Sequence, residues 1–127
     1  MNVNQELDAF REGLAGCEVA ALIDLSTSMV LSTSFGTRIP QEELDALAST
    51  ARSVLTGPMA EAALSPDGEA EPDALEGLLA SHNETRAFLR SSSDRQEALV
   101  CICAVDADLA QVFRVGRETL TKIMASN

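Results

Sequence analysis

Aromatic side chains are nearly absent from this sequence of 127 residues. It has no tryptophan, no tyrosine and only four phenylalanines, so aliphatic side chains and alanine must fill any core. Hydrophobic residues nevertheless make up 46% of the chain, and a chain of this length buries roughly two-thirds of the surface that it exposes when unfolded. The composition therefore excludes disorder throughout and predicts one folded domain spanning residues 1–127.

Basic residues are also scarce. Nine lysines and arginines stand against twenty aspartates and glutamates, which gives a net charge of −11. Such a charge repels the phosphates that dominate nucleic-acid affinity and the anionic headgroups of a membrane surface. The basic residues form no stripe along the chain either. We therefore expect no nucleic-acid partner.

Targeting and membrane signals are missing as well. The first residues contain no basic segment followed by an apolar one, which argues against a secretory signal. No apolar run approaches the ~20 residues that a membrane-spanning helix needs, so no membrane insertion is expected. With no sign of export, the three cysteines are interpreted as reduced thiols, and the protein as cytoplasmic.

The sequence also lacks the known motifs for catalysis or metal binding. The chain has no Gly-x-Ser-x-Gly, Walker loop, His-Glu-x-x-His or dinucleotide fingerprint, and the acidic residues at 67–76 lack the spacing of an EF-hand. Cys101 and Cys103 share one face of a strand, where two thiolates could chelate a metal. Zinc would need two more ligands, and only Cys17 and His82 remain. We therefore interpret the cysteines as small core residues and expect no enzyme activity, metal or cofactor.

Hydrophobic periodicity predicts most of the secondary structure. Residues 17–24 and 98–105 are apolar on both faces, which is typical of strands in the middle of a sheet. Residues 85–90 alternate as a half-buried strand does. Apolar residues at helical spacing follow Pro40, and Gly57-Pro58 should kink or end that helix. The expected order is helix 4–14, strands 17–24 and 29–33, helix 40–56, an extra helical turn at 59–64, a mobile loop at 65–73, strands 85–90 and 98–105, and helix 106–125 capped by Asp106 or Asp108.

Residues 74–81 give conflicting signals. Asp73 to Glu76 has the pattern of a capping box that opens a helix, whereas Gly77 interrupts such a helix and leaves it too short to be stable without tertiary support. Local signals alone therefore leave helix and strand open. The two doubly apolar strands are expected side by side with helices on both faces of the sheet. This arrangement is an α+β sandwich around an antiparallel sheet.

The order of elements and two signatures resemble the Roadblock (dynein light chain) family over about residues 5–125. One signature is Val-Ala-Ala-Leu-Ile-Asp at 19–24, followed by Met-Val-Leu-Ser-Thr at 29–33. The other is Ala-Leu-Val-Cys-Ile-Cys-Ala-Val-Asp-Ala-Asp-Leu at 98–109, where an apolar strand enters the last helix through an Asp-containing turn. The chain departs from the family pattern in three places. Ser26-Thr27-Ser28 stands in the hairpin turn where Asp-Gly is common, Ala110 stands at the opening of the final helix where glycine is common, and the loop 65–73 is longer and more acidic than expected.

The resemblance implies a profilin-like, Roadblock-type sandwich. Its sheet would have five antiparallel strands, with the long helix on one face and the two terminal helices on the other. It implies a strand at 74–81, and homodimers or paired heterodimers formed by this strand and the long helix. It also implies a non-catalytic scaffold or regulator, often of a small Ras-like GTPase.

The residues themselves support self-association. As an edge strand, 74–81 carries three leucines and little charge, and its unpaired backbone groups are a template for a second copy, which gives a two-fold interface. A monomer whose edge is covered by the acidic loop is one alternative. Another is a ligand-sensing or structural subunit without a GTPase partner, which binds a small molecule between sheet and long helix. The expected interface residues are Leu75, Leu78, Leu79, Leu47, Ala51, Val54 and Leu55.

Overall fold

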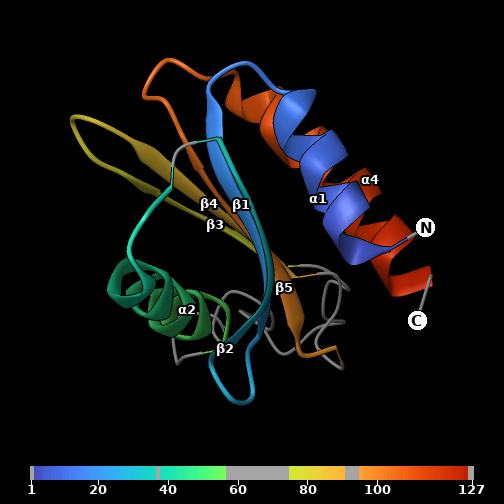
Figure 1. Ribbon diagram of the computed structural model, residues 1–127. Helices are drawn as coiled ribbons and strands as arrows, with labels where there is room; N and C mark the ends of the chain where they lie inside the picture. Colours follow the sequence, from blue (N-terminus) through green and yellow to red (C-terminus); the bar gives the residue numbers. More distant parts are fainter. Residues whose placement is uncertain (1, 37, 57–74, 91–94, 126–127) are drawn as a thin grey trace, which may run out of the picture.

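The computed structural model describes residues 2–36, 38–56, 75–90 and 95–125 of the chain. Helices and strands follow one another within these ranges in the predicted order (Figure 1). The predicted helical turn at 59–64 and loop at 65–73 lie outside the described residues. The elements are α1 (Val3–Glu12), β1 (Cys17–Asp24), β2 (Met29–Phe35), α2 (Gln41–Thr56), β3 (Leu75–Ala80), β4 (Thr85–Arg90), β5 (Glu97–Cys103) and α4 (Leu109–Ala125).

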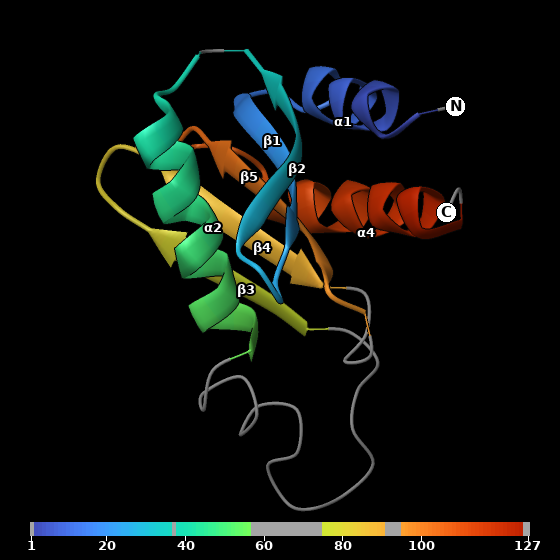
Figure 2. The ribbon, with the colours of Figure 1, turned by 60° about the horizontal axis from the view of Figure 1, so that its bottom comes forward.

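The strands form one five-stranded antiparallel sheet in the order β2-β1-β5-β4-β3. The two strands predicted to be central, β1 and β5, are neighbours in it. Helices α1 and α4 lie side by side on one face, and α2 covers the other (Figures 1 and 2). The predicted α+β sandwich is confirmed. The ambiguous segment is the strand β3, because its backbone pairs with β4 across a tight hairpin.

Side-chain alternation along the strands builds two hydrophobic cores, one on each face of the sheet. The first lies beneath α1 and α4 and the second beneath α2. The first includes Leu7, Phe10, Ala20, Leu22, Leu89, Leu99, Val112, Leu120, Ile123 and the three cysteines. The second includes Val19, Ala21, Ile23, Leu47, Ala48, Ala51, Leu55, Phe88, Ala98, Val100 and Ile102.

A β-bulge at the start of β1 changes which face Cys17 joins. Cys17 pairs with Cys103 and Val19 pairs with Ile102, so a step of two residues along β1 matches a step of one residue along β5. The extra residue, Glu18, points to solvent. In a regular strand Cys17 would share the face of Val19, but the bulge turns its side chain into the core beneath α1 and α4.

The prediction that β4 is half-buried is wrong. Ala87, Phe88 and Leu89 are at most 1% exposed and Arg90 is 7% exposed, so both faces are covered. The reason is that β4 is an interior strand between β5 and β3. Its apparently polar face, with Arg86 and Arg90 on either side of Phe88, lies beneath α2, and the two arginines contact that helix near its opposite ends.

The end of the chain differs from the prediction by a few residues. β5 ends at Cys103 and α4 begins at Leu109, because a turn in which the Ala107 amide donates to the Ala104 carbonyl separates them. Of the two expected caps it is Asp108 that accepts, from the Gln111 amide at 3.2 Å. Within the described ranges, no helix combines the length and apolar character needed to cross a bilayer.

Candidate functional site

β3 forms one edge of the sheet. Its six residues pair with β4 in an unbroken register from Leu75 opposite Arg90 to Ala80 opposite Thr85. No described strand pairs with its other side. Leu78 is 43% exposed and Leu79 is 45% exposed, and as neighbours in a strand they lie on opposite faces of the sheet. The edge therefore combines regular backbone with apolar side chains, the combination that favours pairing with another strand.

Gly77 sets the distance between this edge and α2. A Cβ atom at this position would lie 2.4 Å from Cγ1 of Val54, which is far inside van der Waals contact. The helix therefore packs directly on the backbone of β3. The same glycine weakened the helix interpretation of the sequence, but a glycine within a strand also signals close approach of another element.

The one acidic side chain of β3 is paired within the chain. Arg117 of α4 donates two hydrogen bonds to Glu76, with Nη2 at 2.7 Å from Oε1 and Nε bonded to Oε2. The hydrogen bonds and the charge of Glu76 raise the pKa of the Arg117 guanidinium above its usual range. The carboxylate at the edge is thus partly neutralised, and it opposes a second copy less than a free charge would.

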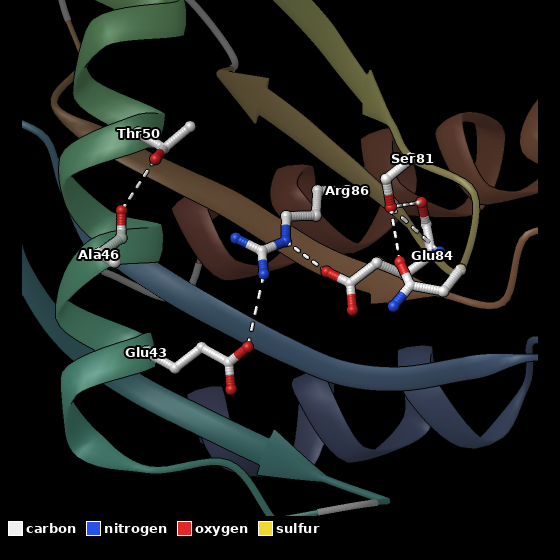
Figure 3. A network of polar contacts seen from close by, with 7 residues as sticks. Glu43, Ala46, Thr50, Ser81, Glu84 and Arg86 are labelled. Atoms are coloured by element: carbon white, nitrogen blue, oxygen red, sulfur yellow. Dashed lines mark hydrogen bonds and ion pairs between the residues drawn. The ribbon is translucent and has the colours of Figure 1, made fainter.

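A polar network fixes the β3–β4 hairpin to the first half of α2 (Figure 3). Arg86 donates from Nε to Glu84 at 2.6 Å and reaches Glu43 of α2 at 3.5 Å. The Ser81 hydroxyl lies 2.8 Å from the Asn83 side-chain oxygen and accepts from the Glu84 amide. These residues and Leu79 line a polar groove of about 430 Å³ beside the edge.

The expected interface residues lie in different environments. Leu78 and Leu79 are exposed, as an interface requires, but Leu47, Ala51 and Leu55 are completely buried against the sheet. These three form core within one chain. Of the remaining two, Val54 is half-buried on Gly77, while Leu75 pairs through its backbone with Arg90 and its side chain is outside the described part. The outward face of α2 consists instead of Glu42, Asp45, Ala46, Ser49, Arg52 and Ser53.

β2, at the other edge, is irregular. Leu22 pairs with Ser32 and Ile23 pairs with Val30, so Leu31 is an extra residue in the register. Such a bulge bends and twists an edge away from regular pairing. Although Leu31 is 50% exposed, its backbone is a poorer template than that of β3.

The three cysteines meet beneath α1 and α4. Their sulfur atoms all lie within 4.8 Å of one another, and all three residues are buried. Hydrogen bonding with Cys101 and Cys17 lowers the pKa of Cys103, while hydrogen bonding with Cys103 and Cys17, together with burial, raises that of Cys101. His82, the fourth ligand considered from the sequence, is exposed in the β3–β4 hairpin and is not part of this cluster.

Solved structures with the same arrangement of strands and helices superpose on this chain. A Roadblock/LC7 domain from Streptomyces avermitilis superposes with a TM-score of 0.78 at 11% identity, covering 99% of this chain and 98% of that one. Myxococcus xanthus MglB superposes with a TM-score of 0.72 at 20% identity, covering 98% and 96%. The chain has the Roadblock/LC7 fold. The sequence itself matches no protein-family model and no curated protein.

The Roadblock/LC7 fold of this chain is also profilin-like, as predicted. A profilin from Schizosaccharomyces pombe superposes with a TM-score of 0.58 at 14% identity, covering 99% of both chains. Since the sequence identities are this low, the likeness concerns the arrangement of strands and helices.

Proposed function

We propose that this protein is a dimeric interaction module that self-associates through β3. The observation that carries the proposal is the regular edge at β3, which no described strand pairs on its outer side and which has an exposed leucine on each face. Antiparallel pairing of β3 with its own copy satisfies the free backbone groups and makes a two-fold interface in which each leucine meets residues of the other copy. The bulge at Leu31 makes the β2 edge the less suitable one.

The net charge of the chain favours a small, apolar contact between two copies over a broad polar one. Each copy carries a net charge of −11, so two copies repel one another over a Debye length of about 10 Å at 0.1 M salt. The contact must therefore gain its free energy from backbone hydrogen bonds and buried leucines. The pairing of Glu76 with Arg117 reduces local repulsion at the point where the two edges meet.

Replacing Leu78 by aspartate is expected to weaken the dimer by about tenfold or more in Kd, because a loss of 1.4 kcal/mol already corresponds to tenfold. The substitution places like charges near one another across the two-fold axis. Leu31→Asp is the matched control, since it adds the same charge to an equally exposed leucine on the opposite edge. Sedimentation velocity over a range of concentrations measures both variants against the parent chain.

The expected result is a parent dimer, a Leu31→Asp dimer and a Leu78→Asp variant shifted toward monomer. A parent chain that stays monomeric at high concentration would contradict the proposal. Equal weakening by both variants would show that net charge, and not β3, controls the association. Circular dichroism of each variant establishes that the fold is retained.

We infer that the partner of this module is a small Ras-like GTPase. The support is the Roadblock-type architecture together with the family resemblance of residues 19–33 and 98–109. The polar groove at Arg86 is lined by Glu43 of α2 and by Leu79 and Ala80 of β3, so it lies between that helix and the β3 edge.

Affinity capture with the immobilised parent chain is expected to recover a Ras-like GTPase from cells that produce it. Adding the purified chain should change the rate of GTP hydrolysis by that GTPase, or bind it saturably at an unchanged rate if the role is scaffolding. Leu78→Asp should reduce binding if the surface requires the dimer. Recovery of no GTPase, with no effect on nucleotide hydrolysis, would contradict this part of the proposal while leaving the dimer intact.

The packing beneath the middle and end of α2 argues against the small-molecule alternative. In the described part of that interface, Leu47, Ala48, Ala51 and Leu55 pack with Phe88 and the apolar residues of β1 and β5, all at most a few per cent exposed. Under this part of α2 the space where a ligand was considered is therefore filled by side chains, while a groove of about 460 Å³ lies between the start of α2 and β2. Native mass spectrometry of the purified protein should show the bare chain mass.

A further inference from the structure

The cysteine cluster is assembled by two separate backbone features. Cys101 and Cys103 are two residues apart on β5 and so share the face beneath α1 and α4. Cys17 comes from the neighbouring strand and reaches the same face only because of the bulge at Glu18. All three cysteines of the chain thereby meet at one point.

The cluster has the dimensions of a three-ligand site. All three sulfur atoms lie within 4.8 Å of one another, and those of Cys101 and Cys103 are 3.7 Å apart. Three sulfur ligands at a metal–sulfur distance of about 2.3 Å lie roughly 4 Å from one another when the ion is in their plane, and closer together when a lone pair makes the arrangement pyramidal. The cluster must therefore contract to enclose one ion.

We propose that Cys17, Cys101 and Cys103 form a binding site for a soft cation that takes three sulfur ligands. Thiolates select soft ions. Zinc fits less well, since its structural sites need four ligands, and among the described residues no histidine or carboxylate joins this cluster. The surroundings are the apolar core beneath α1 and α4, where an uncompensated charge is costly. A trivalent ion bound by three thiolates is neutral overall, so trivalent arsenic is the ion that suits the site best.

The binding step balances without any redox partner. Arsenite, As(OH)₃, reacts with three thiols, and three As–S bonds form as three As–OH bonds break. Each thiol proton leaves with one hydroxide as water, so that three water molecules are released. No electron is transferred, and the site gains no net charge.

Access is expected from the end of the sheet. Cys17 and Cys103 are the last pair in the register of β1 and β5, and Cys17 is 8% exposed whereas Cys101 is fully buried. The turn between α1 and β1 adjoins this end, with the Cys17 amide bonded to the Leu14 carbonyl. Local opening of that turn would admit the ion to Cys17 first.

The test uses the full chain, reduced and kept without oxygen, titrated with arsenite under native conditions. Native mass spectrometry is expected to show one arsenic per chain with loss of three thiol protons. X-ray absorption at the arsenic edge should show three sulfur neighbours and no oxygen. The spectrum of the parent chain alone decides the coordination, so this result does not depend on whether any variant folds.

Three variants locate the site. Cys17→Ser, Cys101→Ser and Cys103→Ser should each weaken arsenite binding by more than about 100-fold, since loss of even a hydrogen-bonding partner of a metal ligand costs 10–100-fold. Serine preserves the size of the side chain, and thermal unfolding without arsenite reports any loss of stability. In the parent chain, arsenite should raise Tm, because an ion that binds the folded state stabilises it.

Several results would overturn the proposal. One is failure of arsenite to bind the folded chain, which would leave the cysteines as core residues only. Others are two sulfur neighbours in the absorption spectrum, or unchanged affinity in Cys17→Ser. Tighter binding of zinc than of arsenite, with a fourth ligand visible by absorption, would also refute the three-coordinate assignment.

Discussion

Replacing Arg90 by methionine is expected to lower the free energy of unfolding by about 1–3 kcal/mol, the cost of leaving a buried hydrogen-bonding group without its partner. Arg90 is 7% exposed. Its guanidinium donates to the Leu55 carbonyl in the last turn of α2 at 3.1 Å and to the Arg95 carbonyl at 2.8 Å. The first of these bonds satisfies a carbonyl that the helix itself cannot, and it places a positive charge at the negative end of the helix.

Urea unfolding at a fixed protein concentration measures this loss. Arg86→Met is the matched control, because Arg86 lies on the same face of β4 but its side chain is 24% exposed and pairs with carboxylates at the surface. Its loss should cost less than about 1 kcal/mol. Arg90→Lys should recover only part of the stability, since lysine lacks the planar fork that reaches two carbonyls at once. Equal effects of Arg86→Met and Arg90→Met would contradict the capping role.

Gly77→Ala is expected to destabilise the protein by about 1–3 kcal/mol, the usual cost of adding atoms to a packed site. Away from Val54 the opposite sign would be expected, because glycine within a strand costs about 0.5–1 kcal/mol relative to alanine. The added Cβ meets Cγ1 of Val54 at 2.4 Å. Val54 cannot easily turn away, because a β-branched side chain in a helix has one strongly preferred rotamer.

A double-mutant cycle with Val54→Ala isolates this contact. In the Val54→Ala background, Gly77→Ala should become neutral or stabilising, which gives a coupling energy of about 1–3 kcal/mol between the two sites. The unfolding of all four proteins should be followed at the same chain concentration, because dimerisation makes apparent stability depend on concentration. If Gly77→Ala destabilised both backgrounds equally, the helix would not be packed on this glycine.

The central part of the fold could be predicted because its signal is local. Residues 17–24 and 98–105 have apolar side chains on both faces of their strands, and a strand apolar on both faces has to lie inside a sheet. Residues 74–81 could not be assigned in the same way, since the capping pattern at 73–76 is local whereas the pairing of β3 with β4 is not. The sequence predicts β4 as half-buried because two arginines normally indicate an exposed face. The carbonyl of Leu55 that receives Arg90 becomes visible only when the helix is placed.

The candidate site could be predicted in part for similar reasons. Leu78 and Leu79 were identified as edge residues and are exposed. The sequence also places the apolar stripe of α2 in the interface, and Leu47, Ala51 and Leu55 of this stripe are buried against the sheet of their own chain. The bulges at Glu18 and Leu31 depend on register between strands distant in sequence. The meeting of Cys17 with Cys101 and Cys103 could therefore not be read from spacing alone.

The irregular register at Leu31 has a consequence for the size of any assembly. If two copies join through β3, the combined sheet ends in a β2 strand on each side, and both ends carry the same bulge. Neither end is then a good template for a third copy, so growth stops at two chains. An extra residue in one strand would thus limit the assembly to a closed pair and prevent an open-ended polymer.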